Sequence, residues 1–269
     1  MAAMRYVRLL TAFARFGLAR ELAFRGNFVI KVTVELLWLG ILLVFYRTVF
    51  AKTSVVAGWA ESEYLFFVGC YFAMESVIET LFLGNCVEFA ELVRSGDLDI
   101  YLLKPIDEQF LLTCRDFDWS TVPSAVLGVA VMGMSLHEMH RPFVPLRLLA
   151  FVGLFACGVA IAYSFLLMLT ASSIWLVRNQ NLMEAWWLFT SLMRYPKEIF
   201  AVRLAAPLGW FFSFVVPILL VVNVPARVMV GVLDEPWMIG FTVAVAVGLL
   251  VLSRAFFRHA LQRYRSASS

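Results

Sequence analysis

Long apolar runs separated by short polar segments dominate the chain. A helix needs about 20 mostly apolar residues to cross a bilayer, and six stretches reach or approach that length. These stretches are 28–50, 64–87, 119–136, 147–177, 182–195 and 237–257. The pattern therefore predicts an all-α integral membrane protein with six transmembrane helices.

A further apolar stretch, 204–231, is interrupted by Pro207, Pro217 and Pro225. Proline removes a backbone donor and breaks a helix. Irregular backbone at membrane depth is tolerated only where it is buried in protein or lines water. We therefore expect short or re-entrant helices before the last span. A seventh, kinked span is the alternative.

The segment 1–26 has the pattern of an amphipathic helix. Arg5, Arg8 and Arg15 fall on one helical side, and Tyr6, Leu10 and Phe13 fall on another. Such a helix lies in the membrane interface with its basic face toward anionic headgroups. The expected organisation is this interfacial helix, a transmembrane domain over 27–258 and a cytoplasmic tail over 259–269.

Composition supports the membrane assignment. The chain of 269 residues is 62% hydrophobic and 15% charged, whereas soluble domains are about 45–50% apolar and about 25% charged. The formal net charge is only +3, and the basic residues do not form the concentrated patch that nucleic-acid binding needs. Membrane lipid is therefore expected as a partner, and nucleic acid is not.

The distribution of the 22 Lys and Arg residues predicts the orientation. With six spans, most of them lie on the side of the two termini and of the loop 88–117. Cytoplasmic loops carry the excess of basic residues. We expect a multi-pass protein of the cell (inner or plasma) membrane with both termini in the cytoplasm.

Four of the charged residues inside the predicted spans form two close pairs. Lys31 and Glu35 are one helical turn apart and can pair along one face. Glu75 and Glu79 are also one turn apart, near the middle of the second span. Carboxylates at this depth face the protein interior, a water-filled path or a basic residue of another helix. Buried pairing and the lining of a polar pathway both remain open.

The sequence lacks common enzyme signatures. There is no G-x-x-x-x-G-K-[ST] motif to hold a nucleotide phosphate, and there is no H-E-x-x-H or G-x-S-x-G. His137 and His140 form a weak H-x-x-H pair, with Glu138 between them, in a short loop. No cofactor or metal is expected on this chain.

The loop 88–117 contains a charged segment, "RSGDLDIYLLKP", at 94–105. Gly96 is suited to end the preceding helix, and Asp97 to cap a short new one. The segment also offers apolar side chains, with Leu98 and Leu102 on one face and Tyr101 beside them. Such a segment, exposed to the cytosol, is expected to dock into another protein.

Several motifs carry a resemblance to a known family. The pattern G-x-L-D-x-x-L-L-K-P at 96–105 resembles the corresponding loop in membrane subunits of type-2 ATP-binding-cassette (ABC) exporters. The tail "LQRYRS" at 261–266, "RYP" at 194–196, "VVP" at 215–217 and "VPA" at 224–226 are similar to one branch of these subunits.

The resemblance implies a permease subunit that pairs with an identical or homologous permease and with cytoplasmic P-loop ATPase subunits. ATP and Mg²⁺ would bind to those ATPases. The ATPase-coupling residues would be Gly96, Asp97, Leu98, Asp99, Tyr101, Leu102, Lys104 and Pro105. Export is the direction that the resemblance favours. A membrane-embedded enzyme acting on lipid, using Glu75, Glu79 and the histidine loop, is the rival interpretation, and a non-transporting scaffold is a second.

Overall fold

The computed structural model describes residues 2–142, 144–176, 180–201, 205–233 and 235–264. The long helices are α1 (Ala2–Ala23), α2 (Arg25–Phe50), α3 (Glu61–Ile78), α4 (Gly84–Ser95), α7 (Val122–Glu138), α8 (Pro145–Ser172), α9 (Gln180–Met193), α11 (Ile218–Val230) and α12 (Trp237–Arg263). Shorter elements are β1 (Val55–Val56), β2 (Trp59–Ala60), the π-helix η1 (Glu79–Leu83), α5 (Leu98–Leu102), α6 (Glu108–Cys114), the 3₁₀-helix η2 (Lys197–Ala201) and α10 (Ala206–Phe214). The prediction of an all-α membrane protein is confirmed, apart from one small hairpin.

In the part of the chain that the structure describes, four helical segments are long and apolar enough to cross a membrane. They are α2, the continuous segment Glu61–Ser95 of 35 residues, α8 and α12. The predicted third and fifth spans correspond to α7 and α9, which have 17 and 14 residues. The count rises to five if α10 and α11 form one span. α8 ends at Ser172, before the predicted end of the fourth span at position 177, which lies outside the described residues.

The proline-broken stretch forms two helices rather than one. α10 and α11 meet at Pro217 with a bend of 85°. This agrees with the expectation of short or re-entrant helices, because a ring without an N–H cannot continue the helical hydrogen bonds of α10. Pro225, by contrast, lies inside α11, and the helix continues through it to Val230.

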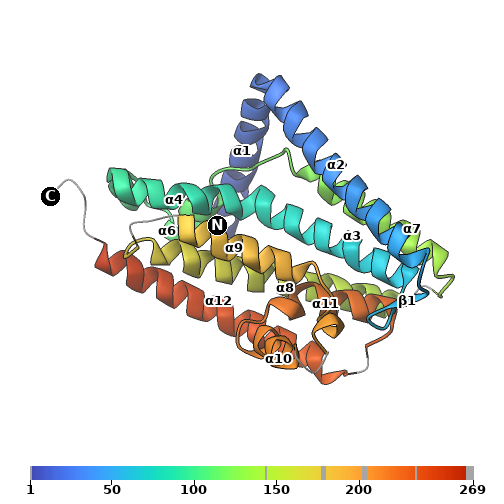
Figure 1. Cartoon of the computed structure of the whole chain (residues 1–269). Helices are drawn as coiled ribbons and strands as arrows, with labels where there is room; N and C mark the ends of the chain where they lie inside the picture. Colours follow the sequence, from blue (N-terminus) through green and yellow to red (C-terminus); the bar gives the residue numbers. More distant parts are fainter. Residues whose placement is uncertain (1, 143, 177–179, 202–204, 234, 265–269) are drawn as a thin grey trace.

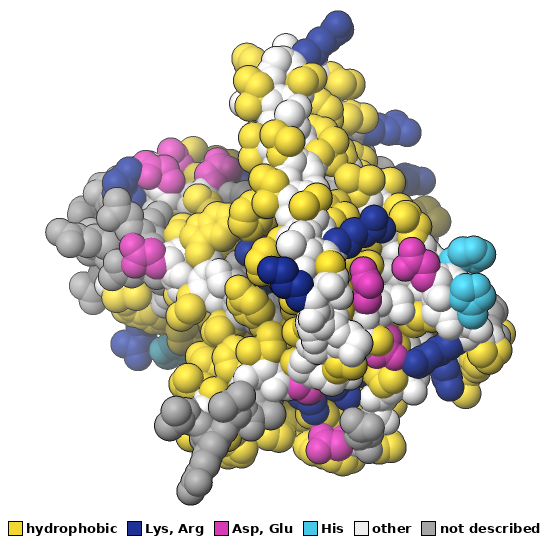
Figure 2. Space-filling model, turned by 45° about the vertical axis from the view of Figure 1, so that its right-hand side comes forward, with side chains coloured by type: hydrophobic (Ala, Val, Ile, Leu, Met, Phe, Trp, Pro, Cys, Tyr) yellow, Lys and Arg dark blue, Asp and Glu magenta, His cyan; other side chains and the backbone are white. Residues whose placement is uncertain are grey.

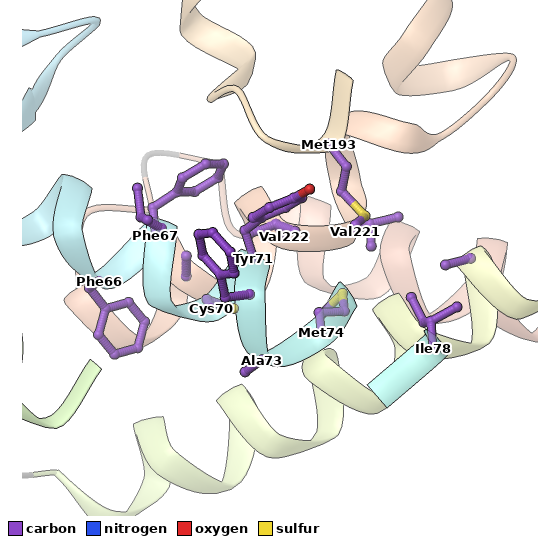
Figure 3. Close-up of a cluster of buried hydrophobic side chains, with 14 of the residues drawn as sticks. Phe66, Phe67, Cys70, Tyr71, Ala73, Met74, Ile78, Met193, Val221 and Val222 are labelled. Atoms are coloured by element: carbon purple, nitrogen blue, oxygen red, sulfur yellow. The ribbon is translucent and has the colours of Figure 1, made fainter. Parts of the chain in front are cut away.

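The core is built around α3, most of whose side chains are buried. In Figure 3, side chains of α3 such as Cys70 and Met74 lie beside Val221 and Val222 of α11, with Met193 above them. α7 runs along another side of α3. There Gly69 and Gly128 approach so closely that a Cβ on either residue would come within 2.7 Å of the carbonyl oxygen of the other. Small residues permit this approach between membrane helices.

The first two helices pack much less tightly. In Figure 1, α1 and α2 form a V that leans away from the bundle of α3, α8 and α12, and α1 runs across the direction of that bundle. Only Leu39, Tyr46 and Phe50 are buried on α2. Figure 2 shows broad hydrophobic areas on the surface, with charged side chains gathered in clusters between them. α2 leaves a groove beside η1 and α4.

The bundle has a "hairpin end", where β1, β2 and residues 139–142 lie. Val55 pairs with Ala60 and Val56 with Trp59, and the turn has positive φ at Ala57 and Gly58. Two central residues with positive φ fit the twist of a tight β-hairpin. This hairpin carries Trp59 into the core, where its side chain is fully buried.

Candidate functional site

The segment Gly96–Pro105, which we call the coupling segment, folds as the motif predicts. α4 ends at Ser95, and Gly96 has a φ of 82°, a left-handed conformation that glycine adopts without steric cost. α5 follows from Leu98 to Leu102. Asp97 occupies the predicted cap position, but its carboxylate makes no capping bond. It accepts a hydrogen bond of 2.8 Å from Ser95 Oγ instead.

The apolar side chains of the coupling segment do not share one exposed face. Leu98 is 0% exposed and belongs to a cluster with Phe89, Leu112 and Phe257. The expectation that Leu98 is available for docking is wrong, because the short helix needs an anchor in its own protein. The exposed apolar side chains are Ile100 at 59% and Leu103 at 86%.

Two cations flank the aromatic ring of the coupling segment. Lys104 Nζ lies 4.5 Å and the Arg115 guanidinium carbon 4.6 Å from the centroid of the Tyr101 ring. Both distances are in the range of cation–π contacts. The carbonyl oxygen of Pro105 accepts a hydrogen bond of 3.1 Å from Arg5. The end of the coupling segment is therefore held by α1 and by the residue that follows α6.

The chain after the coupling segment is clamped by α1 and α12. Asp107 accepts a hydrogen bond of 2.6 Å from Arg254 of α12, and its carboxylate caps α6 by accepting from the Phe110 N–H at 3.1 Å. Tyr6 of α1 packs its ring edge-on against Phe110, with centroids 4.8 Å apart. Part of the predicted apolar face of α1 thus packs on protein.

The pKa of Asp107 reflects this clamp. Burial alone would raise the pKa of this carboxyl group. The hydrogen bonds from Arg254 and from the Phe110 N–H outweigh burial and lower the pKa below its ordinary value. Asp107 is therefore an anion at neutral pH and an effective partner for Arg254.

A second feature is a groove of about 770 Å³ between α2 and the segment η1–α4. Three of the four charged residues singled out in the spans, Lys31, Glu35 and Glu79, line this groove together. Its other charged lining residues are Glu88, Glu91 and Asp118, and its apolar lining includes Ile30, Val34, Leu83, Val87 and Met183. The sequence predicted the residues, but not that helices far apart in the chain would bring them together.

The pairing of these charges differs from the expectation. Lys31 Nζ lies 3.3 Å from an oxygen of Asp118 and 3.5 Å from one of Glu21. No ion pair between Lys31 and Glu35 occurs in the part of the chain that the structure describes. Glu35 instead accepts a hydrogen bond of 3.3 Å from Ser124 of α7. The prediction of a local pair was wrong, because α1 and the α6–α7 loop bring two carboxylates to Lys31.

Glu75 and Glu79 are separated in their surroundings, although they are one turn apart. Glu75 accepts a hydrogen bond of 2.5 Å from Tyr71 Oη, which itself accepts one of 3.3 Å from Arg194. The Arg194 guanidinium also lies 5.1 Å from the Trp38 ring centroid. Glu79 begins the π-helix and lines the groove. One glutamate thus belongs to an interhelical network and the other to a cavity.

Sequence reasoning missed Arg194, Tyr71 and Asp118. Arg194 falls at the end of the predicted fifth span, and the structure places its side chain beside Tyr71 of α3. Asp118 directly precedes a predicted span, and that position was the available signal. For Arg194 and for Asp118, the sequence does not indicate which helix supplies the side chain that each one contacts.

The residues of the rival lipid-enzyme interpretation are not assembled into one site. His137 is in the last turn of α7 and His140 in the loop that follows, which lies at the hairpin end because Arg141 forms an ion pair of 2.6 Å with Glu63. Glu79 is 16 positions beyond Glu63 on a continuous helix, a separation of about 24 Å at the usual rise per residue. Among the described residues, no group of three metal-ligating side chains is present.

Comparison with known proteins decides the family. Residues 36–268 match the family described as ABC-2 family transporter protein. The chain belongs to the ABC-2 transporter family. The resemblance inferred from the coupling segment and the tail is confirmed, although positions 265 and 266 of that tail lie outside the described residues. No curated protein and no solved structure matches the chain.

Membership gives the geometry a context. An ABC-2 family protein is the membrane component of an ABC transporter and works with an ATP-binding subunit. The match includes the whole coupling segment and the η1–α4 side of the groove, whereas the lining residues on α2, from Ile30 to Glu35, precede its first position. The coupling segment and the η1–α4 wall of the groove therefore fall on the matched part of the chain.

Proposed function

We propose that the chain is the permease subunit of an ABC exporter, that it forms half of the translocation pathway, and that it couples to separate ATPase subunits. ATP and Mg²⁺ bind on those ATPases, and a second permease, identical or homologous, completes the pathway. The observation that carries the proposal is the family match together with the coupling segment, a short helix on a glycine turn with exposed Ile100 and Leu103.

The coupling segment is suited to transmit motion. Leu98 anchors it to α4, α6 and α12, and Arg254 ties the next residues to α12. A movement of an ATPase that contacts Ile100 and Leu103 is therefore transmitted to helices of the bundle. Closure of the ATPases upon ATP binding would shift these helices as a rigid group.

The proposed topology has six spans, with α7 and α9 as short spans beside the longer ones, and α1 in the membrane interface. Both termini and Gly96 then lie in the cytoplasm of the cell, and His140 lies outside. Labelling of single cysteines at positions 96 and 140 in a cysteine-free background checks this arrangement. Labelling of position 140 from the cytoplasmic side would contradict it.

The test of the proposed function is recovery of an ATPase with the tagged chain. Replacing Ile100 and Leu103 together by Ala should lower recovery at least tenfold, because buried apolar anchors are each worth roughly 2 kcal/mol in an interface. The matched control is the replacement of Leu146 and Leu149 by Ala, since these leucines are comparably exposed on α8.

Membrane insertion and ATP turnover are measured in the same samples. If native complexes of the wild-type chain contain no P-loop ATPase, the proposed function is wrong. If the Ile100/Leu103 variant retains full recovery and transport while the ATPase is present, the coupling segment is not the docking element.

A further inference from the structure

The groove between α2 and η1–α4 has the size and lining of a small-molecule site. Its volume of about 770 Å³ lies within the range of about 300–1,000 Å³ that is usual for ligand pockets. It opens where α2 leans away from the bundle (Figure 1). A molecule in the groove would contact α2 on one side and η1 and α4 on the other.

The apolar wall of the groove is not used by the core of this chain. Ile30 and Val34 on α2 are 65% and 57% exposed, and Val87 on α4 is also exposed. All three line the groove. They give it an apolar wall that suits the apolar part of a ligand.

The acidic side chains of the groove fall into two kinds. Asp118, Glu88 and Glu91 each have a basic partner, namely Lys31, Arg115 and Arg94. Glu35 and Glu79 pair with no basic side chain of the residues that the structure describes. Both lie within segments long enough to span the membrane, where an acidic side chain is costly and typically functional.

The backbone at Glu79 supports a functional interpretation. The segment changes from α to π hydrogen bonding over Glu79–Leu83, and both terminal residues of this π-helix line the groove. Single π turns inside α-helices occur frequently at functional sites. The cavity, the π-helix and the carboxylates without basic partners are thus independent observations at one place.

We propose that this groove binds amphipathic organic cations as transport substrates. The positive centre lies at Glu35 and Glu79, and the apolar part lies against Ile30, Val34 and Val87. An anion is disfavoured because the carboxylates outnumber Lys31, which is itself held by two of them. A metal ion is disfavoured because the described residues offer no group of three suitable ligands.

The inference rests on the proposed function, since it names the substrate class of the same permease. Its test compares two probes of nearly the same shape and opposite charge, tetraphenylphosphonium and tetraphenylborate, by equilibrium dialysis against the purified full chain in detergent. The wild-type chain should bind the phosphonium more tightly than the borate. Replacing Glu35 or Glu79 by Gln should weaken phosphonium binding about tenfold, as expected for one charge-assisted contact.

Two further variants serve as controls. Glu61→Gln removes an exposed carboxylate outside the groove and should leave phosphonium binding unchanged. Glu79→Asp keeps the negative charge and should retain most of the phosphonium binding. Equal binding of the two probes by the wild-type chain, or loss of phosphonium binding in Glu61→Gln but not in Glu79→Gln, would overturn the inference.

A third measurement separates this inference from the proposed function. Recovery of the ATPase with the wild-type chain and its ATP turnover are recorded with and without each probe. An associated ATPase that the phosphonium stimulates more than the borate supports both proposals. An associated ATPase with no preference between probes overturns the substrate class only. Phosphonium-selective binding without any ATPase overturns the proposed function only.

Discussion

Acidic side chains form ion pairs at the hairpin end, whereas two acidic side chains in the groove have no basic partner among the described residues. At the hairpin end, Glu63 forms an ion pair of 2.6 Å with Arg141, and Glu198 forms one of 3.1 Å with Arg227. In the groove, Glu35 and Glu79 pair with no basic side chain of the described residues. Glu63 and Glu79 lie on the same continuous segment, Glu61–Ser95. The difference separates carboxylates that fasten the fold from carboxylates that remain available to a ligand.

The fastening at the hairpin end joins distant parts of the chain. Trp59 of the hairpin donates a hydrogen bond of 2.9 Å to Glu198, and the Arg227 guanidinium lies 5.0 Å from the Trp59 ring centroid. Arg227 is only 7% exposed on α11. A charge buried to this degree requires a partner. These residues therefore hold the hairpin, η2 and α11 together.

The largest expected effect is at this buried pair. Glu198→Ala removes both the ion pair with Arg227 and the acceptor of the Trp59 indole N–H, and should lower the free energy of unfolding by about 4 kcal/mol, as for other broken buried pairs. Unfolding in mixed detergent micelles measures the loss. Glu61→Ala, at an exposed position near the same end, is the control. Equal stability of the two variants would show that the pair does not fasten the fold.

The same contrast is expected within the coupling segment. Leu98→Ala should cost about 3 kcal/mol of unfolding free energy, because it leaves a cavity in a packed cluster. Ile100→Ala should cost less than about 0.5 kcal/mol, since surface substitutions have small effects on stability. The comparison is made by the same unfolding measurement. A larger loss at Ile100 than at Leu98 would reverse the assignment of anchor and docking residue.

A direct comparison of two glutamates on one helical segment sharpens the argument. Glu63→Gln removes the charge that faces Arg141 and should lower the free energy of unfolding by about 2 kcal/mol, since part of that pair is exposed. Glu79→Gln should leave stability unchanged or increase it, because it replaces a carboxylate without a basic partner by a neutral group. Thermal unfolding of both variants, side by side, decides this. Greater destabilisation by Glu79→Gln than by Glu63→Gln would mean that Glu79 also stabilises the fold.

The smallest effect is expected at Asp107, whose ion pair with Arg254 is partly exposed. Its pKa is lowered in the folded chain, so its contribution is present above the unfolded value of about pH 4 and is lost as the pH falls through the folded pKa. Solvent screening limits the contribution to less than about 1 kcal/mol. Asp107→Asn should therefore flatten the acid limb of a plot of stability against pH. An unchanged acid limb in this variant would show that other carboxyl groups control it.

The ends and breaks of helices could be predicted from the sequence because they depend on neighbouring residues. Gly96 ended a helix, the prolines broke 204–231, and the long apolar runs became helices. The number of membrane spans was harder to predict from the sequence. α7 and α9 are short, and hydropathy alone does not distinguish a short span from a helix that packs inside a bundle.

The candidate residues were predicted better than their partners. Lys31, Glu35 and Glu79 were identified as unusual because charges are costly inside apolar segments. Three features depend on contacts between residues tens of positions apart. They are the shared groove, the pairing of Lys31 with Asp118, and the connection from Glu75 through Tyr71 to Arg194. Spacing along one helix indicates only which residues share a face.

The sequence by itself determined that this is a helical membrane protein of the ABC-2 family. Apolar length, breaking residues and the motif around Gly96 are local properties of the chain, and the family match covers most of it. Only the tertiary structure decided that Leu98 is an anchor while Ile100 and Leu103 are exposed, and that Glu75 and Glu79 lie in different surroundings. The physical reason is that burial and charge pairing are set by whichever helix packs alongside, and the packing of helices from distant parts of the chain is a property of the whole fold.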